Sequence, residues 1–91
     1  MHYVYILLLK NGDLYVGLSA DLRRRIKEHH RGQVESTRGY EPRLIHYECY
    51  ILESDARRRE KFLKTTEGKR LLRQQIRDIL LEKIPSHWEI V

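Results

Sequence analysis

Two short tyrosine-containing triplets near the N-terminus carry side chains suited to phosphodiester chemistry. The first is Tyr-Val-Tyr at 3–5 and the second is Tyr-Val-Gly at 15–17, and a basic segment with Arg25 and His29 follows them. Hydrolysis of a phosphodiester needs an activated water and stabilisation of charge on the phosphoryl oxygens. Phenols, a guanidinium and an imidazole can supply these functions, provided that a carboxylate for a metal ion lies nearby.

The first elements that must position these groups are two strands. The aromatic, β-branched and aliphatic run 3–9 predicts a central strand that is buried on both of its faces. The turn signal Asn11-Gly12 predicts a hairpin, because both residue types tolerate positive φ. Residues 14–18 are then the antiparallel partner strand, and residues 44–50 form a third strand.

A helix is expected to follow the hairpin, capped by Ser19 or Asp21 and ended near Gly32. Its inward stripe recurs at helical spacing, with Arg25 beside it, and consists of Leu22, Ile26 and His29. The segment 33–43 lacks periodicity and is predicted to be an exposed loop. Its polar residues Ser36, Thr37 and Arg38 would then be available for contacts with phosphate.

A second helix is predicted from Asp55 to about Lys64, with Ser54 as its N-cap. Glu60 shares one face of this helix with Ala56 and Leu63. A carboxylate on an inward face is costly to bury unless it has a partner. The partner is either a metal ion or a cation one helical turn away, Arg57 or Lys64.

A third helix is expected from Thr66 or Glu67 to Pro85, with an apolar stripe that includes Leu72 and Ile76. The predicted order of elements is therefore β-β-α-β-α-α. The simplest packing is an α+β fold in which helices flank a small three-stranded antiparallel sheet. We expect residues 1–91 to form a single domain, because a chain of this length supports one modest core.

The overall composition favours a nucleic-acid partner. The formal charge of the 91-residue chain is +5, and the basic residues cluster in the predicted second and third helices. That cluster is equally consistent with a solvated helix surface. No segment is long and apolar enough for a signal peptide or a membrane span. The single cysteine, Cys49, excludes an intramolecular disulfide, which agrees with an expected cytoplasmic location.

Taken together, these motifs resemble those of the GIY-YIG nuclease superfamily. The triplets 3–5 and 15–17 match the two motifs that name the family, with Tyr3 where the family usually has glycine. Arg25, His29 and Glu60 match the family's helix arginine, a histidine one turn later and its metal-binding glutamate. Family members often carry a late-helix asparagine, whereas the only asparagine here is Asn11, in the turn. The similarity is greatest to small stand-alone bacterial members that resemble the excision-repair incision nuclease.

The resemblance implies a metal-dependent endonuclease acting on DNA rather than RNA, with a role in DNA repair. Glu60 would hold Mg²⁺, or alternatively Mn²⁺, and Arg25 would bind the scissile phosphate. Tyr15 or His29 would accept a proton from the attacking water, and Tyr5 would position water or phosphate. Gly17 would allow close approach of a helix or of the substrate, which Lys64 would also contact. The alternatives are a non-catalytic nucleic-acid-binding module and a protein-interaction adaptor with the same fold.

Overall fold

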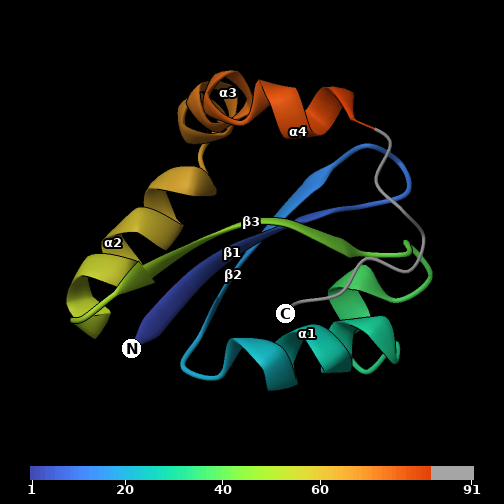
Figure 1. Ribbon diagram of the computed structural model, residues 1–91, viewed down its shortest axis with the longest axis horizontal. Coiled ribbons are helices and arrows are strands. Elements are labelled where there is room, and N and C mark those ends of the chain that lie inside the picture. The colour runs from blue at the N-terminus through green and yellow to red at the C-terminus, as the bar shows by residue number, and fades with distance from the viewer. Residues whose placement is uncertain (83–91) are drawn as a thin grey trace.

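The computed structural model describes residues 1–82 and places a three-stranded antiparallel sheet between two layers of helices (Figure 1). The strands are β1 (His2–Leu8), β2 (Leu14–Ser19) and β3 (Arg43–Tyr50), in the spatial order β2-β1-β3. Helix α1 (Leu22–His30) covers one face of the sheet. Helices α2 (Glu53–Leu63), α3 (Thr66–Gln75) and α4 (Arg77–Leu81) lie on the opposite side. The predicted α+β class and the order of its elements are confirmed.

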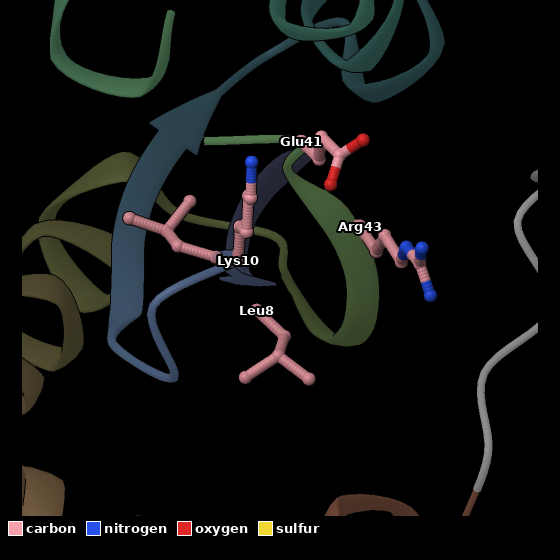
Figure 2. Close-up of a pocket in the computed structure, with 5 residues that line it drawn as sticks. Leu8, Lys10, Glu41 and Arg43 are labelled. Carbon is pink, nitrogen blue, oxygen red and sulfur yellow. The ribbon is translucent and has the colours of Figure 1, made fainter. Parts of the chain in front are cut away.

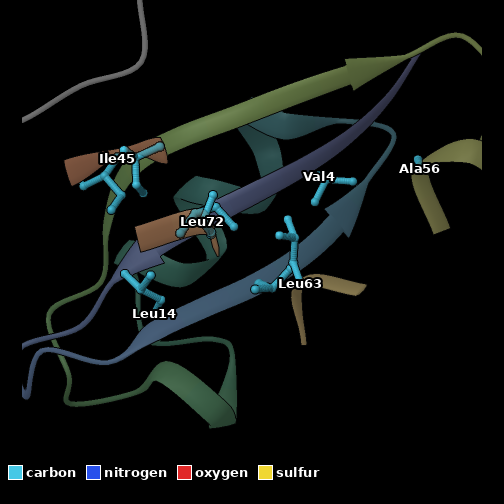
Figure 3. Close-up of a cluster of buried hydrophobic side chains, with 9 residues drawn as sticks. Val4, Leu14, Ile45, Ala56, Leu63 and Leu72 are labelled. Atoms are coloured by element: carbon cyan, nitrogen blue, oxygen red, sulfur yellow. The ribbon is translucent and has the colours of Figure 1, made fainter. Parts of the chain in front are cut away.

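The central strand β1 is buried on both faces, as its composition predicted. Val4 and Ile6 belong to the apolar cluster beneath α2 and α3, which also contains Ala56, Leu63 and Leu72 (Figure 3). Alternate residues of β1 point to the other face, because successive side chains of a strand alternate. There, Tyr5 and Leu7 pack with residues of α1 and β3, namely Leu22, Ile26 and Leu44.

The hairpin between β1 and β2 forms at the predicted turn. Gly12 has a φ of +91°, and the Asn11 side chain accepts a hydrogen bond from the backbone N–H of Asp13 at 3.0 Å. This turn sets a register in which Tyr5 lies opposite Gly17 and Leu7 lies opposite Tyr15. Both tyrosine-containing triplets are thereby brought to neighbouring positions on the sheet.

Helix α1 begins and ends close to the predicted residues. The Asp21 side chain accepts a hydrogen bond from the backbone N–H of Arg24 at 3.2 Å, so Asp21 rather than Ser19 is the cap. Gly32, with a φ of +71°, follows the helix. The chain then enters a short 3₁₀ helix, η1 (Glu35–Thr37), in the segment predicted to be an exposed loop.

Two predicted helix boundaries are wrong. Helix α2 begins at Glu53, earlier than predicted, because the Leu52 carbonyl already accepts a helical bond from the Ala56 N–H at 3.3 Å. No side chain caps this end of the helix. The predicted third helix is divided at Ile76, whose backbone leaves the helical region while its side chain remains buried in the core. The predicted helix end at Pro85 lies outside the described residues. Within residues 1–82, no helix is long and apolar enough to cross a membrane.

Candidate active site

A chain of hydrogen bonds through three buried side chains forms the centre of the candidate site. The Tyr5 hydroxyl lies 2.9 Å from Nε2 of His29, and Nδ1 of His29 lies 2.8 Å from Oγ1 of Thr37. These residues come from β1, α1 and η1, and none is more than 1% exposed. The Thr37 hydroxyl in turn donates to the backbone carbonyl of Val34 at 3.5 Å. The polar side-chain atoms of Tyr5, His29 and Thr37 therefore all have hydrogen-bond partners inside the protein.

Burial decides the protonation state of His29. Together with the smaller effects of the nearby charges of Arg25 and His30, it lowers the pKa of His29 to about 4. This value lies well below the ordinary histidine pKa of 6.5, which weakens His29 as the group that accepts a proton from the attacking water. At neutral pH His29 is an uncharged hydrogen-bonding group beneath the tyrosines, and it is shielded from solvent.

The rings of the two predicted tyrosines both pack against this histidine and lie close to each other. The rings of Tyr5 and Tyr15 each meet the imidazole of His29 edge to face, with centroids at 5.6 and 5.3 Å respectively. Tyr5 is buried, whereas Tyr15 is half-buried. Of the two phenols, Tyr15 is thus the one that bulk water can approach.

The opposing glycine makes this arrangement of aromatic rings possible. A Cβ atom built on Gly17 would lie 2.2 Å from Cζ of Tyr5. Any side chain at this position would displace the phenol ring. Gly17 was predicted to allow close approach of a helix or of the substrate, but the group that lies close to it is the Tyr5 ring. This contact within the sheet was not predicted from the sequence.

Arg25 lies beside the Tyr5 phenol at the margin of α1. Its guanidinium is held by Glu28 at 3.0 Å, and its side chain is 35% exposed. Burial raises the pKa of Tyr5, and the neighbouring guanidinium of Arg25 acts in the opposite direction. The net shift is upward, so Tyr5 stays protonated in the resting protein. The ion pair with Glu28 therefore orients the Arg25 side chain, and its partial exposure leaves the guanidinium accessible to a ligand.

Glu60 lies on α2, the helix on the other side of the sheet. Its negative charge makes the smallest of the contributions to the raised pKa of Tyr5. The predicted inward face of α2 is confirmed at Ala56 and Leu63, which are fully buried. Glu60 lies at the margin of this face, 18% exposed, with Lys64 at 3.1 Å.

The carboxylate of Glu60 suits a hydrated divalent ion. Within residues 1–82, no group of three or more His, Cys, Asp or Glu side chains could enclose a metal. Mg²⁺ keeps several waters and needs only one or two carboxylates, so a single partly exposed glutamate fits this chemistry. Lys64, predicted to contact substrate, is instead paired with Glu60 in the structure. A bound divalent ion would replace that partly exposed ammonium as the counter-charge.

The predicted phosphate-binding residues, which lie in η1 and directly after it, do not form one surface. Ser36 and Arg38 are exposed, and Nε of Arg38 donates to the carbonyl of Gly32 at 2.9 Å. Thr37 is fully buried and contacts His29, so the expectation that it lies in an exposed loop is wrong. It turns inward because its hydroxyl has two partners there, the imidazole and the Val34 carbonyl.

A separate pocket opens at the far end of β1 (Figure 2). It has a volume of about 240 Å³ and is lined by Leu8, Leu9, Lys10, Glu41 and Arg43. None of the site residues predicted from the sequence contributes to it. The candidate active site is thus defined by converging polar side chains rather than by this cavity.

The fold and this set of residues identify a class of nuclease-type domain. Residues 1–75 match the family model of the GIY-YIG catalytic domain, and the chain belongs to the GIY-YIG family. It is 40% identical over 82 residues to a UPF0213 protein of Haloquadratum walsbyi, covering 86% of this chain and 92% of that protein. A UPF0213 protein of Staphylococcus aureus is 36% identical over 74 residues, covering 79% and 90% of the two chains.

The fold also matches a solved structure. The solution NMR structure of a UPF0213 protein from Bacillus halodurans aligns with a TM-score of 0.55 and 36% sequence identity. The alignment covers 81% of this chain and 83% of that one. The chain is therefore similar to small stand-alone members of the family, as its motifs predicted.

Proposed function

We propose that this protein is a metal-dependent endonuclease that hydrolyses phosphodiester bonds in DNA. The observation that carries the proposal is the hydrogen bond between the Tyr5 hydroxyl and Nε2 of His29 at 2.9 Å, with the Arg25 guanidinium beside the same phenol. Glu60, on α2, makes the smallest of the contributions to the raised pKa of Tyr5. Membership of the GIY-YIG family supports nuclease chemistry at this point.

Each side chain has a distinct part in the proposed mechanism. Arg25 binds the oxygens of the scissile phosphate, where its planar fork stabilises the charge that develops in the transition state. Glu60 would hold one divalent ion, Mg²⁺ or Mn²⁺, and that ion would supply Lewis acidity that lowers the pKa of a bound water. Tyr15, the phenol open to water, would act in its deprotonated form and take the proton of the attacking water. Tyr5 remains protonated and orients the reacting groups.

The expected substrate is DNA of particular structure rather than of particular sequence. The described part of the chain is a small sheet with short helices, and it presents few side chains for reading base edges. Its basic character instead suits contacts with phosphates, which do not depend on sequence. We place the protein in the cytoplasm, where a DNA-repair nuclease of a bacterial type would act.

The experiment is a cleavage assay on nicked, branched and single-stranded DNA and on matched RNA, with Mg²⁺ and with chelator. Glu60→Gln keeps the shape of the side chain and removes its charge, and we expect it to lower cleavage by about 10³-fold or more. Glu67→Gln is the matched control, because Glu67 is an exposed glutamate of α3 paired with Arg70. Full activity in folded Glu60→Gln protein would refute the mechanism. Binding without cleavage by the wild-type protein would instead identify a binding module.

A further inference from the structure

The Tyr5 hydroxyl has a hydrogen-bond direction that the structure determines. Its proton needs an acceptor, because Tyr5 is only 1% exposed and a buried hydroxyl without a partner is costly. Arg25, which lies beside the phenol, has only donor groups. Nε2 of His29, at 2.9 Å, is therefore the acceptor. The phenol donates inward, to the histidine.

The protonation of the histidine follows from this direction. His29 is neutral at pH 7, so its one ring proton must lie on Nδ1 when Nε2 is an acceptor. Nδ1–H then donates to Oγ1 of Thr37 at 2.8 Å. Thr37 can accept this bond because its own proton has another acceptor, the carbonyl of Val34. The three bonds point the same way, from Tyr5 through His29 and Thr37 to the backbone.

We propose that Thr37 is a positioning residue that fixes the direction of this chain and thereby makes the Tyr5 oxygen an acceptor toward Arg25. With its proton committed to His29, the phenol presents only oxygen lone pairs on its other side, where its hydrogen-bond partner is the Arg25 guanidinium. A phenol turned the other way would point its proton at that cation and could no longer hold it. The inference rests on the proposed function, and it assigns Tyr5 to orienting Arg25 rather than to direct contact with the substrate.

Removal of the threonine hydroxyl should reverse the direction. In Thr37→Val, which conserves the side-chain shape, Nδ1–H would be buried without an acceptor. Orphaned buried N–H groups are rarer in proteins than unsatisfied acceptors. The neutral ring should therefore shift its proton to Nε2 and donate to Tyr5. The phenol would then turn its own proton outward, which exchanges an acceptor for a donor at the site.

The first test is spectroscopic and needs no substrate. In ¹⁵N-labelled wild-type protein at pH 7, imidazole nitrogen shifts of His29 should show a protonated Nδ1 and a bare Nε2. Thr37→Val should increase the share of the tautomer protonated at Nε2, whereas Thr37→Ser should restore the wild-type pattern. Glu35→Gln, at an exposed neighbour in η1, is the control and should leave the nitrogen shifts of His29 unchanged. A wild-type ring protonated at Nε2 would overturn the inference even if Thr37→Val fails to fold.

The second test measures cleavage. Thr37→Val should lower kcat by about 10- to 100-fold, the range found for outer partners of active-site ligands, while KM for DNA stays the same. Thr37→Ser should recover most of the lost rate. An unchanged kcat in folded Thr37→Val would refute the positioning role. If the wild-type protein cleaves no substrate, the proposed function fails, and the nitrogen shifts still decide whether Thr37 sets the tautomer.

Discussion

Two arginine triplets lie on helices that cover opposite faces of the sheet. Residues 23–25 belong to α1, and residues 57–59 belong to α2. In each triplet the third arginine is partly buried and the first two are exposed. The inward arginine of α1, Arg25, lies beside the Tyr5 phenol and has one acidic partner, Glu28. The inward arginine of α2 has a different environment.

Arg59 is part of a closed polar cluster between α2 and β3. Its guanidinium makes two bonds to the Glu48 carboxylate, at 2.9 and 3.1 Å. Burial alone would raise the pKa of Glu48, but hydrogen bonds from Arg59, His46 and Tyr50 outweigh it and lower the pKa to about 2. These bonds leave no free donor fork for a ligand. The same residue type is therefore available for chemistry in one helix and committed to structure in the other.

Arg25→Ala should have the largest effect on cleavage, and it should distinguish the chemical role of Arg25 from the structural role of Arg59. Loss of a guanidinium that stabilises transition-state charge should lower cleavage by about 10²- to 10³-fold. The free energy of unfolding should change little, because the ion pair of Arg25 with Glu28 is partly exposed and of the weak surface type. Single-turnover cleavage and urea denaturation of the same preparation measure both quantities.

Arg24→Ala is the matched control, because Arg24 shares Glu28 with Arg25 but is exposed. It should retain nearly full cleavage. Equal losses in the two variants would mean that charge on α1, rather than the position beside Tyr5, is what matters.

Arg59→Ala should show the reverse pattern, with a loss of stability and little loss of cleavage per folded molecule. Removing one partner leaves a partly buried carboxylate without its main donor, at a cost of about 2–3 kcal/mol at pH 7. Arg58→Ala removes an exposed pair with Asp55 and should cost less than about 1 kcal/mol. Urea denaturation of the wild type and both variants provides the comparison.

The pH dependence of that cost follows from the pKa of Glu48. The folded-state pKa is about 2, below the ordinary value of 4.5, so the folded protein binds fewer protons between these limits. The contribution of the pair is full above pH 4.5 and is lost as the pH falls toward 2. The stability gap between wild type and Arg59→Ala should therefore narrow across this window. A gap that stays constant down to pH 3 would contradict the assignment.

The contrast between the triplets also shows what the sequence could and could not predict. Strand alternation, the Asn11-Gly12 turn and the helical stripe of α1 are local patterns, and they predicted the fold and the inward position of His29. The roles of Thr37 and Glu48 depend on contacts between elements. Thr37 meets His29 only because η1 folds back under α1, and no spacing rule connects the two residues. The sequence therefore predicted that loop as exposed.

The sequence could not predict which cations are available to contact DNA, for a similar reason. The sequence favoured the basic run of α2 and α3, but most of those side chains have partners. The acidic partners are Glu53 for Arg57, Asp55 for Arg58, Glu48 for Arg59, Glu60 for Lys64 and Glu67 for Arg70. Within residues 1–82, Arg23 and Lys27 of α1 have no acidic partner and are exposed one helical turn apart. Helix α1 is thus a further candidate for contacts with phosphates.

The smallest expected effect is on the salt dependence of DNA binding, measured without metal so that no cleavage occurs. The slope of log affinity against log salt reflects the counterions released, about 0.9 per neutralised phosphate on duplex DNA. Arg23→Gln with Lys27→Gln should reduce this slope by about 2. Arg57→Gln with Arg58→Gln removes the same formal charge but should change the slope much less. Those arginines would have to leave Glu53 and Asp55 to contact DNA, so few counterions are released through them. Equal reductions in the two double variants would show that binding follows net charge, and that the pairing of each arginine has no influence.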